Sequence, residues 1–103
     1  MEQCLFCKII NKEIPSSIIY EDERFVAFKD INPKAPVHYL VVPKIHVKDI
    51  MGLDKAYMGK TLEMIQEIAS KESLDAKGFN LVNNCGKDAG QAVFHVHFHI
   101  LSG

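Results

Sequence analysis

The sequence predicts an α+β fold: a largely antiparallel sheet of about five strands, one long helix and a short N-terminal helix. Three observations predict it: short β-rich runs follow one another, one amphipathic segment interrupts them, and Gly and Pro stand singly where elements should end. The 103 residues, 48% hydrophobic and 24% charged, are typical of one globular domain. We therefore expect a single domain spanning residues 1–103.

The first half of the chain predicts a helix and three strands. Residues 5–10 have the apolar i, i+4 spacing of a short helix. Residues 18–20 and 24–28 are β-rich runs separated by charged residues, which predicts a hairpin. Two prolines indicate a loop at 32–36, and residues 37–42 then form a third strand.

The second half predicts the long helix and two more strands. Tyr, Thr, Met and Ile side chains recur at positions 57, 61, 64, 65 and 68, on one mostly apolar face of a helix. This helix should begin near Asp54 and end before Gly78. Residues 79–82 and 93–101 are the remaining predicted strands.

Charge and cysteine content exclude several classes of protein. A net charge of −1 argues against broad electrostatic binding to nucleic acid or membrane. The apolar runs are too short to span a membrane, and Met1-Glu2-Gln3 does not begin a signal peptide. Three cysteines, an odd number, indicate a reducing compartment with free or metal-bound thiols. We expect a cytoplasmic protein with no nucleic-acid or membrane partner.

Three histidines, His95, His97 and His99, alternate with apolar residues in the last predicted strand. Alternate residues of a strand share a face, so the imidazoles should lie together, about 6–7 Å apart. The apolar residues should enter the core; they are Phe94, Val96, Phe98 and Ile100. Such a face can hold a transition metal, or one imidazole can be a nucleophile for an anionic substrate. The glycine-containing loop at 83–91 offers backbone amides and favours phosphate chemistry.

Cys4 and Cys7 form a Cys-x-x-Cys pair. Such a pair can bind zinc with two further ligands, form a redox couple, or remain two unligated thiols. Cys85 stands alone, so the completing ligands would be histidines.

The region at 90–100 resembles the signature of the histidine-triad (HIT) superfamily, His-φ-His-φ-His-φ-φ with φ apolar. Matching segments lie in order over nearly the whole chain: 6–10 (FCKII), 13–15 (EIP), 26–31 (VAFKDI) and 40–46 (LVVPKIH). The pair Gly90-Gln91, which precedes the three histidines, resembles the sequence at this position in the Hint branch of the superfamily. The resemblance implies a HIT-like fold, a homodimer with a continuous sheet, and hydrolysis of nucleoside 5′-phosphoramidates or related purine nucleotide conjugates.

The resemblance also implies roles for individual residues. His97 would be the nucleophile that attacks the α-phosphorus. His99, Asn83 and the backbone amide of Val93 would hold the phosphate oxygens, and Asp30 would bind the ribose hydroxyls. Gln91 also belongs to the implied nucleotide site. The base would lie in an apolar slot of residues that, by spacing alone, are equally compatible with an ordinary core: Phe6, Ile9, Phe28 and Ile31.

A structural zinc ion is implied by the same resemblance, with four ligands: Cys4, Cys7, His46 and His95. Ala92 departs from the family pattern, which commonly has serine there. Two alternative functions remain. The chain is a non-catalytic nucleotide- or zinc-binding module, or it is a metal-dependent enzyme that uses His95, His97 and His99 together as ligands.

Overall fold

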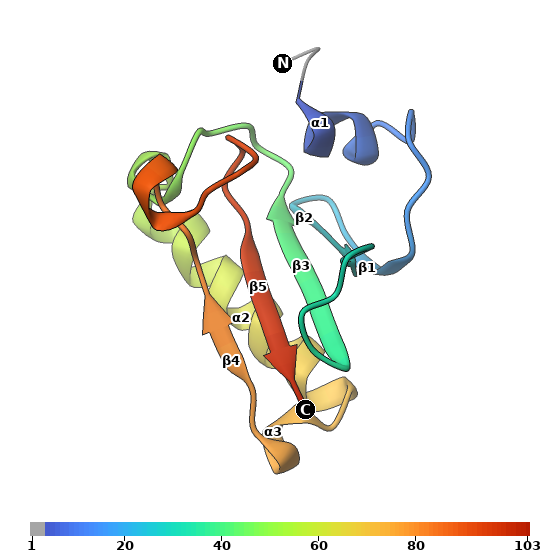
Figure 1. Ribbon diagram of the computed structural model, residues 1–103. Coiled ribbons are helices and arrows are strands. Elements are labelled where there is room, and N and C mark those ends of the chain that lie inside the picture. Colours follow the sequence, from blue (N-terminus) through green and yellow to red (C-terminus); the bar gives the residue numbers. More distant parts are fainter. Residues whose placement is uncertain (1–3) are drawn as a thin grey trace.

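Five strands form one sheet (Figure 1). They are β1 (Ile18–Glu21), β2 (Phe25–Lys29), β3 (Val37–Pro43), β4 (Asn80–Val82) and β5 (Phe98–Ser102). The spatial order is β1-β2-β3-β5-β4 and every neighbouring pair is antiparallel. This computed structural model describes residues 4–103, so the expectation about Met1, Glu2 and Gln3 lies outside the described residues. The predicted α+β class with an antiparallel sheet is confirmed.

The helices follow the local signals of the sequence, with one interruption. They are α1 (Leu5–Ile10), α2 (Lys55–Lys71) and α3 (Leu74–Lys77), with short 3-10 turns η1 (Ile50–Gly52) and η2 (Lys87–Ala89). Asp54 caps α2 by accepting the backbone N–H of Tyr57 at 2.8 Å. Ser73 has φ 60°, a left-handed conformation that separates α2 from α3. None of these helices, within residues 4–103, is long and apolar enough to cross a membrane.

Two hydrophobic clusters cover the two faces of the sheet. Val41 belongs to a large cluster with Ile65 of α2, whereas its neighbour Leu40 belongs to a second cluster with Phe6 and Ile9 of α1. Adjacent residues of a strand point to opposite faces, so α2 and α1 pack on opposite sides of the sheet (Figure 1). Phe6 and Ile9 of α1 therefore form an apolar surface over this face of the sheet.

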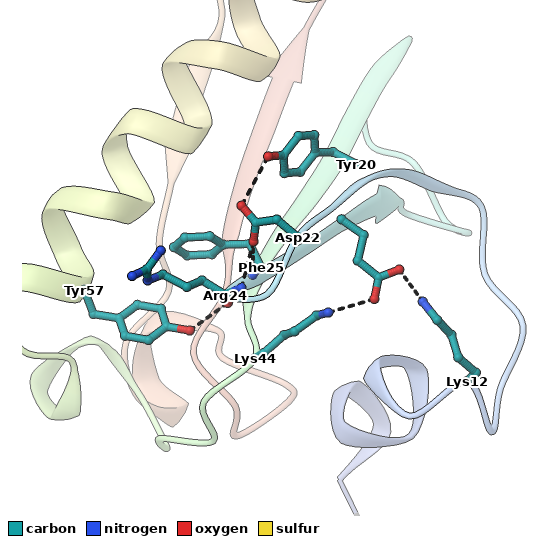
Figure 2. A network of polar contacts seen from close by, with 8 residues as sticks. Lys12, Tyr20, Asp22, Arg24, Phe25, Lys44 and Tyr57 are labelled. Atoms are coloured by element: carbon teal, nitrogen blue, oxygen red, sulfur yellow. Dashed lines mark hydrogen bonds and ion pairs between the residues drawn. The ribbon is translucent and has the colours of Figure 1, made fainter.

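Polar contacts fix the turn between β1 and β2 (Figure 2). The Asp22 carboxylate accepts the backbone N–H groups of Arg24 and Phe25, each at 2.8 Å, and the Tyr57 hydroxyl donates to the Arg24 carbonyl at 2.7 Å. These bonds satisfy the turn and join it to the start of α2.

Glu21 connects two distant segments of the chain. It pairs with Lys12, just after α1, and with Lys44, just after β3, whose Nζ lies 2.8 Å from its carboxylate. These two ammonium groups lower the pKa of Glu21 below its ordinary value. The pairs link the segment after α1 to the sheet.

The last strand is shorter than predicted. The sequence predicts a strand over 93–101, but β5 begins only at Phe98. Pro43 ends β3 and has no N–H with which to continue a ladder. The preceding backbone finds other partners: the Val96 N–H donates to the Val47 carbonyl at 2.8 Å, and Asn83 donates its side-chain amide to the His97 carbonyl at 2.9 Å.

The predicted core face of this segment is correct except at Phe94. Val96, Phe98 and Ile100 are buried in the cluster beneath α2. Phe94 is 44% exposed, with the Lys48 ammonium 5.8 Å from its ring centroid. The expectation for Phe94 was wrong because it lies in a bend at residues 93–95, where the alternation of an extended strand does not apply.

Candidate active site

A pocket of about 680 Å³ opens on the α1 side of the sheet. Its walls come from α1, from β2 and the residues after it, from β3, and from the segment that leads into and forms β5. It brings together eight of the residues expected at a nucleotide site: Phe6, Ile9, Phe28, Asp30, Ile31, Val93, His97 and His99. Asn83 and Gln91 are not among its lining residues.

His97 lines this pocket, and one of its ring nitrogens carries a lone pair instead of a proton. Its Nδ1 lies 2.7 Å from the carbonyl oxygen of His95, and a carbonyl can only accept, so Nδ1 carries the proton. Nε2 is then the unprotonated nitrogen. The side chain is 6% exposed, and burial lowers the pKa of His97 more than the His95 carbonyl and Asp30 raise it. The imidazole is therefore neutral near pH 7, and the ring of Phe6 packs against it with centroids 4.9 Å apart.

His99 presents a donor instead. The backbone N–H of Lys34 donates to His38 Nδ1 at 3.1 Å, so the proton of His38 is on Nε2. That nitrogen lies 2.9 Å from Nδ1 of His99, which must accept, and the proton of His99 is therefore on its Nε2. Burial, with smaller contributions from His97 and His38, lowers the pKa of His99 to about 4. His99 is thus a neutral N–H donor beside the lone pair of His97.

Asp30 directly follows β2 and carries the carboxylate of the pocket. One oxygen accepts the backbone N–H of Asn32 at 2.8 Å, and the other lies 3.5 Å from Nε2 of His38. A carboxylate has about four acceptor positions, so capacity remains for ligand hydroxyls.

The rest of the wall is mostly apolar. Phe6 and Phe28 meet edge to face with ring centroids 5.8 Å apart, and Ile9 is buried beside them. Ile31 also lines the pocket, but it is 88% exposed and lies at its rim. Residues that sequence reasoning missed also line the pocket: Leu5, Ile14, Ser16, Asn84 and Leu101.

Gln91 and Asn83 do not line the pocket. Their side chains donate hydrogen bonds to the carbonyls of Val93 and His97, which do line it. The buried Gln91 side chain accepts the Gly86 N–H at 2.8 Å and donates to two carbonyls, those of Lys48 and Val93. Asn83 bonds the His97 carbonyl. Asn84, the next residue, lines the pocket instead; nothing in the sequence distinguishes two adjacent asparagines until the end of β4 is known.

A second cluster joins the start of α1 to the segment before β5. Cys4 and Cys7 face His46 and His95, and the four donor atoms all lie within 4.8 Å of one another. The two Nδ1 atoms are 3.1 Å apart, and three of the four Sγ–Nδ1 distances run from 3.3 to 3.7 Å. A tetrahedral zinc ion separates two nitrogens by about 3.3 Å and a sulfur from a nitrogen by about 3.6 Å. The donor set therefore fits such an ion.

The protonation state of His95 leaves one of its ring nitrogens available to bind a cation. Nε2 of His95 lies 2.7 Å from the Pro43 carbonyl and so carries the proton, which leaves the Nδ1 lone pair directed at the thiols. Burial raises the pKa of the Cys7 thiol, and Cys4 raises it further. A bound cation would favour the thiolate form of Cys7.

The three histidines do not converge on one point. Nδ1 of His95 faces the cysteines, Nδ1 of His97 donates to a carbonyl, and Nδ1 of His99 accepts from His38. Among residues 4–103, no group of potential metal ligands contains all three. The geometry does not support a metal-dependent enzyme that uses them together.

The chain is similar to known proteins over nearly its whole length. The HIT domain family matches residues 11–103. An uncharacterized HIT-like protein of Helicobacter pylori is 50% identical over 99 residues, 96% of this chain and 95% of the relative. The purine nucleoside phosphoramidase of Escherichia coli is 38% identical over 105 residues, 99% of this chain and 88% of the relative.

A solved structure shows the same fold. The HIT family hydrolase from Clostridium thermocellum superposes with a TM-score of 0.94 at 44% identity, covering 100% of this chain and 92% of the other. The predicted HIT-like fold is thereby confirmed. Since both the family match and these relatives extend over nearly the whole chain, it belongs to the histidine-triad (HIT) family.

Proposed function

We propose that the protein hydrolyses purine nucleoside 5′-phosphoramidates or related nucleoside monophosphate conjugates, with His97 as the nucleophile. The observation that carries this proposal is the state of His97: a buried, neutral imidazole whose Nδ1–H is held by a carbonyl and whose Nε2 is unprotonated in a pocket. The named activity of the E. coli relative is consistent with it.

In the first step, Nε2 of His97 attacks the α-phosphorus. A P–N bond to the enzyme forms, the bond to the leaving amine breaks, and the amine departs with the electron pair and takes a proton from water. The nucleotidyl-imidazole carries positive charge, which the His95 carbonyl stabilises at 2.7 Å from Nδ1. Water then attacks the phosphorus, the P–Nε2 bond breaks, and the nucleoside monophosphate and neutral His97 are released.

Neighbouring residues orient the substrate. The Nε2–H of His99 donates to a phosphate oxygen as charge develops, as does the backbone amide of Val93. Asp30 accepts hydrogen bonds from the ribose hydroxyls, and the base lies against Phe6 and Phe28. Asn83 and Gln91 act indirectly, through the carbonyls that they bind.

The direct test is the release of AMP from adenosine 5′-phosphoramidate by wild type and by His97→Asn. We expect kcat to fall by about 10³-fold or more, as when a nucleophile is removed, while AMP binding and the unfolding temperature persist. Rapid quenching at alkaline pH should trap an adenylyl group on wild type alone. Comparable rates for the two proteins would refute the enzyme and favour a non-catalytic nucleotide-binding module.

We further propose a structural zinc ion held by Cys4, Cys7, His46 and His95. The match between their separations and a tetrahedral ion supports it. The ion would join α1 to the segment that carries His97 and supplies no chemistry to the reaction itself. Cysteines that bind a metal ion instead of forming disulfides also favour a reducing compartment, the cytoplasm.

The protein is also proposed to act as a homodimer through the edge strand β4. This strand ends the sheet on one side, and Leu81 in its middle is 42% exposed. An unpaired edge can extend into a second copy. Light scattering should give twice the monomer mass, and Leu81→Lys should shift the mass toward the monomer; a monomeric wild type contradicts the proposal.

A further inference from the structure

Ser16 carries an unpaired hydroxyl beside the pocket. In the part of the chain that the structure describes, it is the one buried side-chain oxygen or nitrogen without a hydrogen-bond partner. Ser16 also belongs to the pocket wall. Buried polar groups are nearly always paired, and an unpaired one is unfavourable. A ligand in the pocket would supply the missing partner.

The position of Ser16 is opposite the histidines. It precedes the edge strand β1, and the carbonyl of its neighbour Ser17 accepts the N–H of Lys29 in β2 at 3.0 Å. His99 is on β5, three places away in the order β1-β2-β3-β5. At the usual spacing of strands this is about 14 Å, comparable to the length of a nucleoside monophosphate.

Apolar side chains occupy the space between these two ends. Phe28 of β2 and Leu40 of β3 line the pocket between Ser16 and His99. The pocket is therefore polar where the histidines and Asp30 lie, apolar in its middle, and polar again at Ser16. A purine nucleotide has the same sequence of polar and apolar parts.

We propose that Ser16 determines base specificity by hydrogen-bonding the exocyclic group at C6 of a purine. This inference rests on the proposed function, which places the phosphate at His97 and His99 and the ribose at Asp30. The base then crosses the apolar middle, and its edge farthest from the ribose reaches Ser16. Rotation about the Cα–Cβ bond turns the hydroxyl from its shielded position into the pocket.

A hydroxyl suits either common purine. It accepts a hydrogen bond from the amino group of adenine and donates one to the carbonyl of guanine. Ser16 therefore does not choose between adenine and guanine. It selects bases that carry a polar group at C6 over bases that carry none.

The test compares wild type, Ser16→Ala and the matched control Ser17→Ala. Calorimetry measures the Kd of AMP, of GMP, and of purine riboside 5′-monophosphate, which has hydrogen at C6. Ser16→Ala should weaken AMP and GMP by about 2- to 10-fold, the range expected for one neutral hydrogen bond. The same variant should leave purine riboside 5′-monophosphate within about twofold. Ser17→Ala should change none of the three.

Other results would overturn the inference. Equal weakening of AMP and purine riboside 5′-monophosphate, or no weakening of AMP, removes the contact at C6. If ligand-free Ser16→Ala unfolds at a lower temperature than ligand-free wild type, the hydroxyl already has a partner without ligand. This result also overturns the inference. These failures leave the proposed function intact as long as wild type binds AMP. A wild type that binds none of the three nucleotides refutes the proposed function and this inference together.

Discussion

His38 and His99, 61 residues apart in the sequence, share a hydrogen bond of 2.9 Å across the pairing of β3 with β5. The backbone of Lys34 sets the direction of this bond, because its N–H occupies Nδ1 of His38. The consequence is that His99 can only donate toward the pocket. The backbone amide of Lys34 thus determines, through His38, which nitrogen of His99 is protonated.

His38 is accordingly a positioning residue, and its removal should affect the reaction more than substrate binding. In His38→Leu, His99 loses the bond that fixes its tautomer, and we expect kcat to fall by about 10- to 100-fold with little change in KM. In His38→Gln, the side-chain amide can still donate to His99, and kcat should recover in part. Steady-state kinetics on adenosine 5′-phosphoramidate measure both. An unchanged kcat in His38→Leu would contradict the role.

The stability of the protein should decrease in mild acid because of His99. Its pKa is about 4 in the folded protein, below the ordinary value of 6.5 for an unfolded chain. Between these values the unfolded state binds more protons, so the free energy of unfolding falls as the pH drops from 6.5 toward 4. It should be insensitive to His99 above and below this window. The full loss is as much as about 3 kcal/mol for one proton.

Urea unfolding of wild type and His99→Asn from pH 4 to 7.5 measures this effect. Burial also lowers the pKa values of His95 and His97, so the variant should keep part of the pH dependence. Its slope should be smaller than that of wild type by up to one proton. Identical slopes would show that His99 is protonated equally in the folded and unfolded states.

The sequence was sufficient where the signal is local. The hairpin around Asp22, the cap at Asp54 and the apolar face of α2 depend on residues within a few positions of one another. Each was predicted from propensity, capping or periodicity. Alternation also placed Val96 and Ile100 correctly in the core.

Features that depend on distant partners were not predictable in the same way. The start of β5 depends on Pro43 and Val47. The Pro43 carbonyl accepts from the His95 side chain, and the Val47 carbonyl accepts from the backbone N–H of Val96. Asn84 lines the pocket and Asn83 does not, and this difference depends on where β4 ends; the role of Asn83 in holding phosphate stays a prediction. The unpaired hydroxyl of Ser16 has no signal in the sequence at all, because burial without a partner is a property of the folded chain.

Asp30 should determine the preference for ribose. Asp30→Asn removes the charge that strengthens hydrogen bonds from the ribose hydroxyls while keeping the size of the side chain. We expect AMP to bind about tenfold or more weakly, whereas 2′,3′-dideoxyadenosine 5′-monophosphate, which lacks both hydroxyls, should bind the variant and wild type alike. Calorimetry with the two nucleotides separates the effects. Equal weakening of both would assign Asp30 to orienting His38, which lies 3.5 Å away.

The proposed zinc site should contribute to the stability of the fold and not to the chemistry of the reaction. Elemental analysis is expected to find about one zinc per chain in wild type and almost none in the double variant Cys4→Ser/Cys7→Ser. Cys85→Ser, which changes the cysteine outside the cluster, should keep its zinc. Since binding to a structural site is part of the folding free energy, chelation should lower the unfolding temperature by about 10 °C or more.

The cluster also has a predicted effect on His97 that a redox pair or two unligated thiols would not have. His95 is a proposed ligand through Nδ1, and its carbonyl holds Nδ1 of His97. Loss of the ion should therefore loosen this carbonyl and lower kcat, while added zinc restores both kcat and the unfolding temperature. A zinc-free wild type that unfolds at the same temperature with and without added zinc would rule out the ion and leave Cys4 and Cys7 as two thiols bonded to imidazoles.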